Sequence, residues 1–337
     1  MLSAEQVARE AAATGFRPES FEKVARLLDV LAGLRSHPFL RSRIALKGGT
    51  ALNLFILDVP RLSVDLDLNV VGAVERETML SERPKVEQAL GAVCSRLGLQ
   101  VRRAPGEHAG GKWRLAYTSS FGRPGTLEID LNFLLRTPLW PVRPGDSRAV
   151  GSLRARDVPL IDVHELAAGK LAALFDRSAS RDLFDVVGLL RGGQLREELL
   201  RLGFVVYGGA SRRDWRQVSL ADVTADPVEM DRQLLPMLRA DLAPARGDLA
   251  RWAESLVVEC RRLLQILLPF DEREIEFLTR LNDGGEIAPE LLTPDPALKS
   301  IIARHPALLW KAQRVRRHLG AQSGEPEAIG EPWLMED

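Results

Sequence analysis

Two aspartates stand two positions apart in a segment that alternates apolar and polar residues. Asp65 and Asp67 lie in VDLDLN, which has the two-residue period of a β-strand. Side chains at positions i and i+2 of a strand leave the same face, so the two carboxylates lie side by side. A hard divalent cation, usually Mg²⁺, relieves their mutual repulsion. A strand with a solvated acidic face is the alternative interpretation.

A third aspartate stands in a second segment of the same kind. Asp130 lies in LEIDLNF, again on an alternating apolar background. If this strand pairs beside VDLDLN, three carboxylates meet and can hold two metal ions in the arrangement used for in-line phosphoryl transfer. One metal then activates an attacking hydroxyl, and the other neutralises a triphosphate and its leaving group.

A glycine turn precedes the first of these strands. Gly48, Gly49 and Thr50 follow a short apolar strand and open TALNLFIL, which has a helix-forming composition. Glycine lets the backbone approach an oxyanion closely, and a helix N-terminus directs free N–H groups at a phosphate. The hydroxyls of Thr50 and Ser63 can add donors. Alone, such a turn is more often an ordinary strand-to-helix connection, but the aspartates that follow favour phosphate binding.

This combination resembles the DNA polymerase β nucleotidyltransferase superfamily, in which a Gly-Gly or Gly-Ser turn and a helix precede a DxD strand and a later single-Asp strand. LKGGTALNL followed by RLSVDLDL more closely resembles the AbiEii/AbiGii-type toxins of type IV toxin–antitoxin systems, which include the mycobacterial MenT nucleotidyltransferases. That branch also has segments similar to ELAAGKLAAL and RDLFDV, and both occur here in the same order. The match covers residues from about 40 to 190.

The resemblance implies a role for each matched residue. Asp65 and Asp67 become metal ligands, and Asp130 becomes the third metal-binding carboxylate and the candidate general base. Ser63 contacts a phosphate or metal, and Lys170 binds the triphosphate as a further catalytic residue. The last segment supplies three groups near the nucleotide, Arg181, Asp182 and Asp185. The resemblance leaves open which of the two aspartates acts.

Several of these residues also have ordinary structural interpretations. Lys170 fits a solvated helix position, and Arg181 with Asp182 fits a charge and capping pair at a helix N-terminus. Arg61 fits a turn residue that forms a weak salt bridge with Asp58.

The resemblance also implies an activity and partners. We expect a Mg²⁺-dependent nucleotidyltransferase that moves a nucleoside monophosphate from an NTP donor to an acceptor hydroxyl. By resemblance to the MenT group, this hydroxyl is at the 3′ end of tRNA, and its modification blocks translation. A cognate winged-helix antitoxin encoded alongside is the implied partner. Two alternatives stay open: modification of a small molecule or protein, as in aminoglycoside-modifying or AMP-transferring enzymes, and a non-catalytic nucleotide-binding member. The intact aspartates argue against the latter.

The elements that position these residues predict an α+β fold. A polymerase-β-like catalytic domain with N-terminal helices and a mixed or antiparallel sheet is expected over residues 1–155. A mainly helical domain over 156–320 carries the Lys170 and Asp185 motifs and binds the acceptor or partner, and an acidic tail occupies 321–337. The local patterns predict a first helix with a Ser3–Gln6 capping box and further helices over 20–35, 75–97, 162–176, 180–193 and 297–319. They also predict strands over 99–135 with a glycine-rich turn at 106–111, and a proline-rich surface connection over 137–147.

Composition sets limits on partners and location. The 337 residues include 46 basic and 46 acidic ones, so no net charge favours a nucleic-acid or membrane surface. Cys94 and Cys260 lie in apolar helical patterns and are expected to be buried free thiols of a reducing compartment. No signal peptide or membrane-spanning stretch is evident, so a cytoplasmic protein is expected. The sequence does not determine the oligomeric state.

Two basic segments contain an aromatic residue. SRRDWRQ spans residues 211–217, and WKAQRVRRHL spans residues 310–319. Basic side chains interleaved with an aromatic ring suit contact with an RNA backbone and stacking on a base. Solvated helix faces are the alternative for both.

Overall fold

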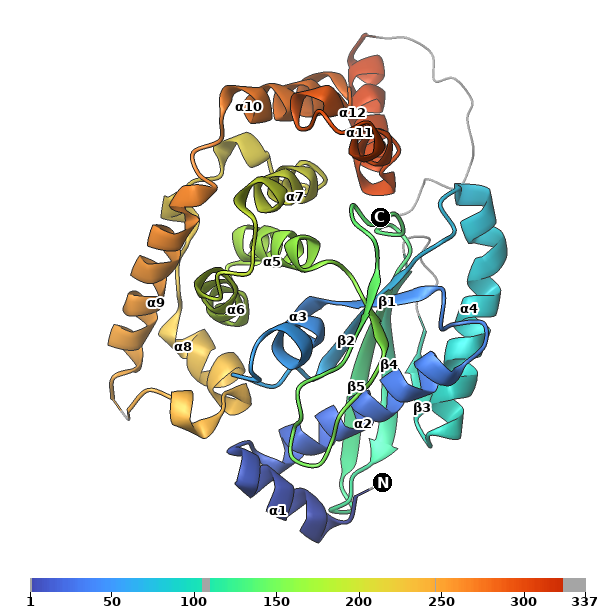
Figure 1. Cartoon of the computed structure of the whole chain (residues 1–337), viewed down its shortest axis with the longest axis vertical. Coiled ribbons are helices and arrows are strands. Elements are labelled where there is room, and N and C mark those ends of the chain that lie inside the picture. Colours follow the sequence, from blue (N-terminus) through green and yellow to red (C-terminus); the bar gives the residue numbers. More distant parts are fainter. Residues whose placement is uncertain (1, 105–109, 246, 324–337) are drawn as a thin grey trace.

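A seven-stranded mixed sheet lies beside a large group of helices in the computed structural model, which describes residues 2–104, 110–245 and 247–323 (Figure 1). The strand order is β3-β4-β5-β2-β1-β7-β6. The expected α+β class is confirmed. The strands are β1 Ile44–Lys47, β2 Asp65–Val70, β3 Gln100–Arg103, β4 Gly110–Thr118, β5 Pro124–Asn132, β6 Arg143–Gly145 and β7 Val158–Leu160.

The pairing in the sheet is mixed. Strand β2 is antiparallel to β1 and parallel to β5, while β3, β4 and β5 form the antiparallel series expected from their alternating pattern. Leu66 and Leu68 of β2 and Ile129 of β5 are fully buried, and the aspartates between them point to the opposite face. The predicted glycine-rich turn between β3 and β4 lies mostly at 105–109, outside the described residues.

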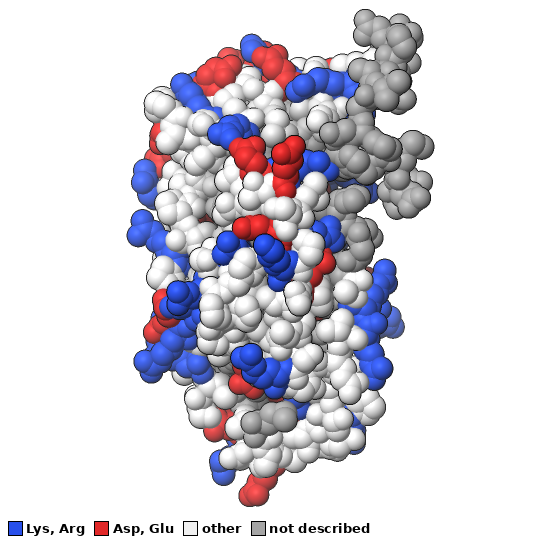
Figure 2. Space-filling view, turned by 90° about the vertical axis from the view of Figure 1, so that its right-hand side faces the viewer, with Lys and Arg blue, Asp and Glu red and all other residues white. Residues whose placement is uncertain are grey.

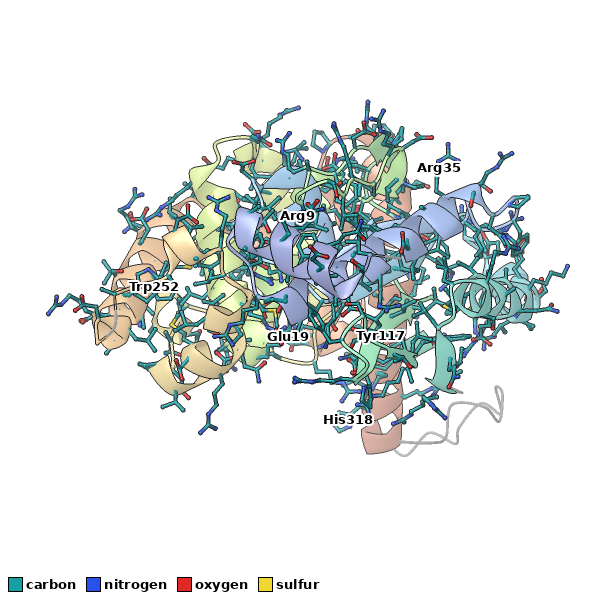
Figure 3. All side chains as sticks on the ribbon, turned by 90° about the horizontal axis from the view of Figure 1, so that it is seen from below. Arg9, Glu19, Arg35, Tyr117, Trp252 and His318 are labelled. Atoms are coloured by element: carbon teal, nitrogen blue, oxygen red, sulfur yellow. The ribbon has the colours of Figure 1, made fainter. Side chains whose placement is uncertain are left out.

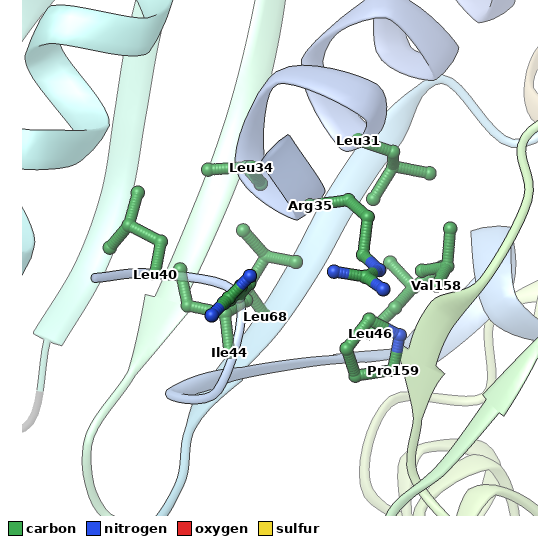
Figure 4. Close-up of a pocket in the computed structure, with 10 residues that line it drawn as sticks. Leu31, Leu34, Arg35, Leu40, Ile44, Leu46, Leu68, Val158 and Pro159 are labelled. Atoms are coloured by element: carbon green, nitrogen blue, oxygen red, sulfur yellow. The ribbon is translucent and has the colours of Figure 1, made fainter. Parts of the chain in front are cut away.

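The apolar face of the sheet is covered by N-terminal helices. These helices are α1 Ala4–Thr14, α2 Pro18–Ser36 and α4 Arg76–Arg96. Leu31 and Leu34 of α2 pack toward Leu46 and Leu68 around a cavity of only about 10 Å³, shown in Figure 4. Between α2 and these strands, the described residues therefore form a filled core. The predicted capping box between Ser3 and Gln6 is confirmed at the start of α1.

The opposite, polar face of the sheet meets the C-terminal helices. The short helix α3 Gly48–Ala51 continues as a π-helix over Leu52–Ile56 and packs against α5. The remaining longer helices form the left and upper parts of Figure 1. They are α5 Val163–Arg177, α6 Ser180–Arg191, α7 Glu197–Gly209, α9 Leu249–Leu263, α10 Glu272–Thr279, α11 Pro296–Ala303 and α12 Pro306–Ser323, with the one-turn α8 Pro227–Glu229 before α9.

Three local expectations differ from the structure. Residues 297–319 form two helices, because Pro306 cannot continue a helix and begins α12 instead. The proline-rich connection over 137–147 contains β6, which extends the sheet beside β7. Helix α12 includes the first three residues of the predicted acidic tail, and the rest of that tail lies outside the described residues.

Trp215, at the centre of the basic segment 211–217, is a core residue. Its ring is fully buried and lies 5.3 Å from that of Phe204 and 5.8 Å from that of Phe175, measured between ring centroids. Its stacking role on RNA, one of two interpretations of that segment, is therefore wrong. Gly208 of α7 leaves the space that the indole occupies.

The molecular surface carries mixed charge. Figure 2 shows Lys and Arg interspersed with Asp and Glu over one face, in keeping with 46 residues of each sign. Seen from below in Figure 3, Arg35 of α2 and Trp252 of α9 lie at opposite ends of the molecule. Cys94 and Cys260 are buried and unbonded to each other, as predicted. In the described part of the chain, every helix is too short or too polar to cross a bilayer.

Gly208→Ala is expected to lower the free energy of unfolding by about 1–3 kcal/mol, because the added methyl group overlaps the indole of Trp215. Gly91→Ala in α4 is the matched control, since a Cβ there meets no atom within 4 Å. The control should gain about 0.5–1 kcal/mol from the better helix propensity of alanine. Urea unfolding of both variants measures the difference in the free energy of unfolding. An equal change in the two variants would contradict the close packing of Trp215 against Gly208.

Candidate active site

Four charged side chains form a row across the polar face of the sheet. Lys47 of β1 pairs in register with Asp67 of β2, Asp67 with Asp130 of β5, and Asp130 with Lys112 of β4. Residues directly opposite in paired strands present their side chains on the same face. The sequence predicted the meeting of Asp67 with Asp130 only on the condition that their strands pair, and they do so in parallel.

A second row lies one step along the strands. Asp65 of β2 stands opposite Glu128 of β5, and Glu128 stands opposite Arg114 of β4. Glu128 accepts hydrogen bonds from both Lys112 and Arg114 at 3.1 Å. The basic residues of β4 are thereby held by Glu128, whereas no hydrogen bond or ion pair within the described residues reaches the carboxylates of the three predicted aspartates.

The titration of the aspartates reflects this crowding. Burial and then the charge of Asp67 raise the pKa of Asp65. Burial also raises the pKa of Asp130, against the opposing charge of Lys47. These carboxylates bind protons more tightly than ordinary aspartates, so the site favours the arrival of positive charge.

The glycine turn fits closely against the aspartates. Gly48 has φ +70°, and a Cβ at this position would overlap the carboxylate of Asp67. At Gly49 a Cβ would lie 2.9 Å from Oγ of Ser63, so both glycines are required by space. No side chain caps the helix that begins at Gly48, which leaves its first N–H groups without a capping acceptor. The hydroxyl of buried Thr50 donates to the backbone oxygen of Asp65 at 2.5 Å and thus fixes the turn to β2.

A buried charge network lies behind the turn. Asp185 of α6 is fully buried and accepts two hydrogen bonds from Arg61, at 2.7 and 2.6 Å. Lys170 of α5 lies 3.0 Å from Asp185 and donates to Asp182 at 2.9 Å. The amide of Asn53 joins Asp185 to the backbone oxygen of Gly49, at 3.2 and 2.9 Å.

This network changes the interpretation of three residues. Arg61 is 2% exposed and pairs with Asp185, so the expected weak salt bridge to Asp58 is wrong. Lys170 is not a solvated helix residue but is buried between two carboxylates. Asp182 is buried as well, and it also accepts a hydrogen bond of 2.6 Å from Arg177.

The pKa values of the two buried aspartates follow from the cations around them. Burial raises the pKa of Asp185, but Arg61 and Lys170 outweigh this and bring it down to about 2. Burial likewise opposes Lys170 and Arg177 at Asp182, where the net effect lowers the pKa. Both aspartates are therefore ionised at neutral pH.

Two arginines carry the positive charge of α5 and α6 toward the sheet. Burial raises the pKa of Asp65, and the charge of Arg181 opposes this rise. The hydrogen bond to Asp182 raises the pKa of Arg177, and the charge of Asp67 adds to this rise, so both arginines act on the aspartates of β2 through their charge. The side chain of Arg177 is 63% exposed despite its contact with Asp182. The predicted site residues thus fall into an open group on the sheet and a buried group on α5 and α6.

The open group matches a divalent cation in its chemistry. Its carboxylates are hard oxygen donors without partners, and Asn69, farther along the same face of β2, is buried with neither side-chain polar atom bonded. Among the described residues, no three His, Cys, Asp or Glu side chains are already grouped to hold a metal. Mg²⁺ is usually held by one or two carboxylates together with substrate phosphates and water, so the donor set fits a metal that binds with a nucleotide.

Sequence reasoning missed several residues of this region. Lys47 and Asn69 lie within the quoted motifs KGGT and VDLDLN, where the two-residue period could have placed Asn69 on the aspartate face. Asn53 and Arg177 contact aspartates of α6, and no local sequence pattern predicts these contacts.

Comparisons with known proteins agree with this geometry. The family model described as "Nucleotidyl transferase AbiEii toxin, Type IV TA system" matches residues 29–258. Among solved structures, the nucleotidyltransferase toxin MenT4 from Mycobacterium tuberculosis H37Rv is similar in fold, with a TM-score of 0.54 and 20% sequence identity. That similarity covers 92% of this chain and 99% of the other. No curated protein sequence matches the chain.

Asp185→Asn is expected to lower the free energy of unfolding at neutral pH by about 3–5 kcal/mol, because Arg61 and Lys170 lose the charge that they share. The pKa of Asp185 is about 2 in the folded chain and, for an unfolded aspartate, about 3.9. Its stabilisation is therefore complete above about pH 4 and is lost as the pH falls toward 2. The gap between wild type and variant should narrow over that range.

Urea unfolding at a series of pH values measures this gap. Asp146→Asn is the control, because Asp146 is half exposed and lies 3.7 Å from Arg154, and because an asparagine oxygen can still accept the hydrogen bond from the backbone N–H of Asp157. It should change stability by less than about 0.5 kcal/mol at every pH. If Asp185→Asn changed stability as little as the control does, the buried pairing of Asp185 with Arg61 and Lys170 would not stabilise the fold.

Proposed function

The chain belongs to the AbiEii family of nucleotidyltransferase toxins from type IV toxin–antitoxin systems, and on this premise we propose that it transfers a nucleoside monophosphate from Mg²⁺-bound NTP to the 3′ end of tRNA. The protein is a nucleotidyltransferase, and its family implies an NTP substrate and an antitoxin partner. The observation that carries the proposal is the group of unpartnered carboxylates beside an uncapped glycine turn.

In this proposal the turn and the carboxylates bind opposite sides of the donor. The N–H groups that begin at Gly48 meet the triphosphate, and Ser63 adds a hydroxyl next to Gly49. Asp65, Asp67 and Asp130 hold Mg²⁺, which when bound neutralises charge on the phosphates. Catalysis then rests on positioning and charge compensation, as in other phosphoryl-transfer enzymes.

The proton of the acceptor hydroxyl goes to Asp130 in this scheme. Burial raises the pKa of Asp130, which makes its carboxylate oxygen a better proton acceptor than that of a solvated aspartate. The charge of Lys47, which stands opposite the neighbouring Asp67, opposes this shift and favours the ionised form of Asp130. Release of pyrophosphate completes the transfer.

Lys170 has one donor left for the nucleotide. An ammonium group has three N–H donors, and two carboxylates account for two of them. We assign the third to the triphosphate, with Asp182 and Asp185 orienting the ammonium group. Arg181 and Arg177, whose charges act on the aspartates of β2, add positive charge near the donor.

The proposal extends to organisation and partners. We assign residues 1–155 to the catalytic domain and 156–320 to a helical domain that contributes Lys170 and binds the acceptor. A winged-helix protein encoded alongside is the proposed antitoxin. The NTP donor and tRNA acceptor both place the reaction in the cytoplasm.

Purified protein with Mg²⁺, each α-labelled NTP and total tRNA should place label on tRNA, and a chelator should abolish the labelling. Asp67→Asn should reduce the rate by at least about 10²-fold, because it removes a proposed metal ligand. Asp146→Asn, away from the aspartate row, is the control and should retain full activity. Label that appears only on protein or on a small molecule would contradict the tRNA acceptor.

Gly48→Ala is expected to reduce labelling about 10²-fold, because its methyl group displaces the carboxylate of Asp67. Gly72→Ala is a matched control: its φ is +92°, so the backbone strain is comparable, but a Cβ there meets nothing within 4 Å. Gly48→Ala should lose more stability in a thermal melt, because only its methyl group overlaps a side chain, so labelling is compared at a temperature at which both variants are folded. Similar activity in the two variants would show that the fit at Gly48 is not needed.

A further inference from the structure

A second polar site is built by residues of the C-terminal helices. A pocket of about 550 Å³ is enclosed by the segment after α7, by the π-helix Arg280–Gly284 and by α12. This volume is within the usual range for ligand sites. The residues that line it and are used below are Arg212, Asp283, Trp310, Lys311, Arg314 and His318.

The pocket joins the two basic segments recognised in the sequence. Arg212 belongs to residues 211–217, and Trp310, Lys311 and Arg314 belong to residues 310–319, about a hundred positions later. Lys311 donates to the backbone oxygen of Ser211 at 2.9 Å, which fixes one segment to the other.

The cations of these segments divide into a paired and an unpaired group. Arg213 pairs with Asp222 at 2.9 Å, and Arg216 pairs with Asp214 at 2.8 Å and with Asp283 at 2.7 Å. The acidic residue of the pocket, Asp283, shares Arg216 with Asp214, so its charge is already partly compensated. Arg212 and Arg314 have no carboxylate partner in the part of the chain that the structure describes.

The pocket therefore has an excess of positive charge. Burial lowers the pKa of Lys311, Asp214 opposes this effect, and the charges of Arg314 and Arg216 lower it further. An anion bound between Arg212, Lys311 and Arg314 would relieve this repulsion.

An aromatic ring lies beside the cations. Trp310 is partly exposed, and the guanidinium carbon of Arg314 lies 4.8 Å from the centroid of its ring. Val315 and Leu319 add apolar surface to the same wall. The guanidinium of Arg314 lies over one face of the ring, so a base can stack on the other face of this partly exposed indole with its phosphate near the cations.

The pocket lies on the part of the molecule that borders the catalytic strand. Arg304, between α11 and α12, forms an ion pair with Glu75, which follows the carboxyl end of β2. In Figure 1 these helices stand above the sheet, and His318 lies at the edge of the molecule in Figure 3.

We propose that this pocket binds a single-stranded nucleotide of the acceptor RNA, with its base on Trp310 and its phosphate on Arg212, Lys311 and Arg314. The proposal rests on the assigned nucleotidyl transfer to RNA but concerns a separate surface. Here the RNA is held away from the reacting hydroxyl, so the pocket raises affinity without taking part in the chemistry.

Binding of a fluorescein-labelled, single-stranded octaribonucleotide to the full chain, without NTP or Mg²⁺, tests this by fluorescence anisotropy. Arg314→Glu and Trp310→Ala should each weaken binding about tenfold or more. Trp310→Phe should retain most of the affinity, because it keeps an aromatic face. The double variant Arg212→Gln/Arg314→Gln should lower the salt-dependence slope of log affinity by about 1.4.

Arg251→Glu is the charge-matched control. Arg251 lies on α9, its side chain is 85% exposed, and its ion pair with Asp248 is a weak surface contact of 3.3 Å. The affinity of the Arg251→Glu variant for the octaribonucleotide should equal that of wild type. Equal weakening by Arg251→Glu and Arg314→Glu would overturn the proposal in favour of non-specific attraction, and so would full competition by a free mononucleotide at the same concentration.

Steady-state labelling separates this proposal from the assigned function. Arg314→Glu should raise KM for RNA about tenfold while kcat and KM for NTP stay unchanged. If wild type labels no RNA, the assigned function fails, and the octamer measurements still decide whether the pocket binds RNA. If wild type labels RNA and the pocket variants match it in binding and in KM, the pocket proposal fails alone.

Discussion

Charges removed from water must be paired, and this constraint holds the two halves of the molecule together. Asp185 is fully buried, so it depends on Arg61 before β2 and Lys170 of α5 for its charge to be tolerated. Asn53 links the same carboxylate to the backbone of Gly49. The position of the glycine turn is therefore set by a residue of the helical half, far away in the chain.

On the sheet the situation is the opposite, because the aspartate carboxylates of β2 and β5 lie close together and are not paired with a cation in the described residues. Asp67 and Asp130 face each other across a parallel strand pair, with Lys47 and Lys112 at the ends of the row. Ion pairing satisfies Glu128 and the basic residues of β4, but not the aspartates. A closed network that fixes geometry thus lies next to an open group of carboxylates that suits a cation. Within the described residues, this contrast separates the paired carboxylates from the unpaired ones.

Much of this arrangement follows from local sequence, and the rest depends on long-range contacts. The two-residue period predicted β2 and β5 and the shared face of Asp65 and Asp67, because alternation is a property of each strand alone. Helical spacing predicted α2, α4, α5 and α6 in the same way. The parallel register of Asp67 with Asp130 and the contact of Arg61 with Asp185 join distant segments, so no local pattern contains them. Trp215 was misplaced for the same reason, since only Gly208 and Phe204 reveal that its ring is in the core.

The parallel pairing of β2 with β5 also has a consequence for the order of synthesis. Asp67 and Asp130 lie more than sixty positions apart, and a parallel pair needs the intervening chain as its crossover. A nascent chain that ends before β5 has Asp65 and Asp67 but no row, and one that ends before α6 leaves Arg61 and Lys170 without Asp185. The ribosome must therefore have made more than half of the chain before a complete site exists. A product that stops before α6 therefore carries the aspartate row without the buried aspartate that positions the glycine turn.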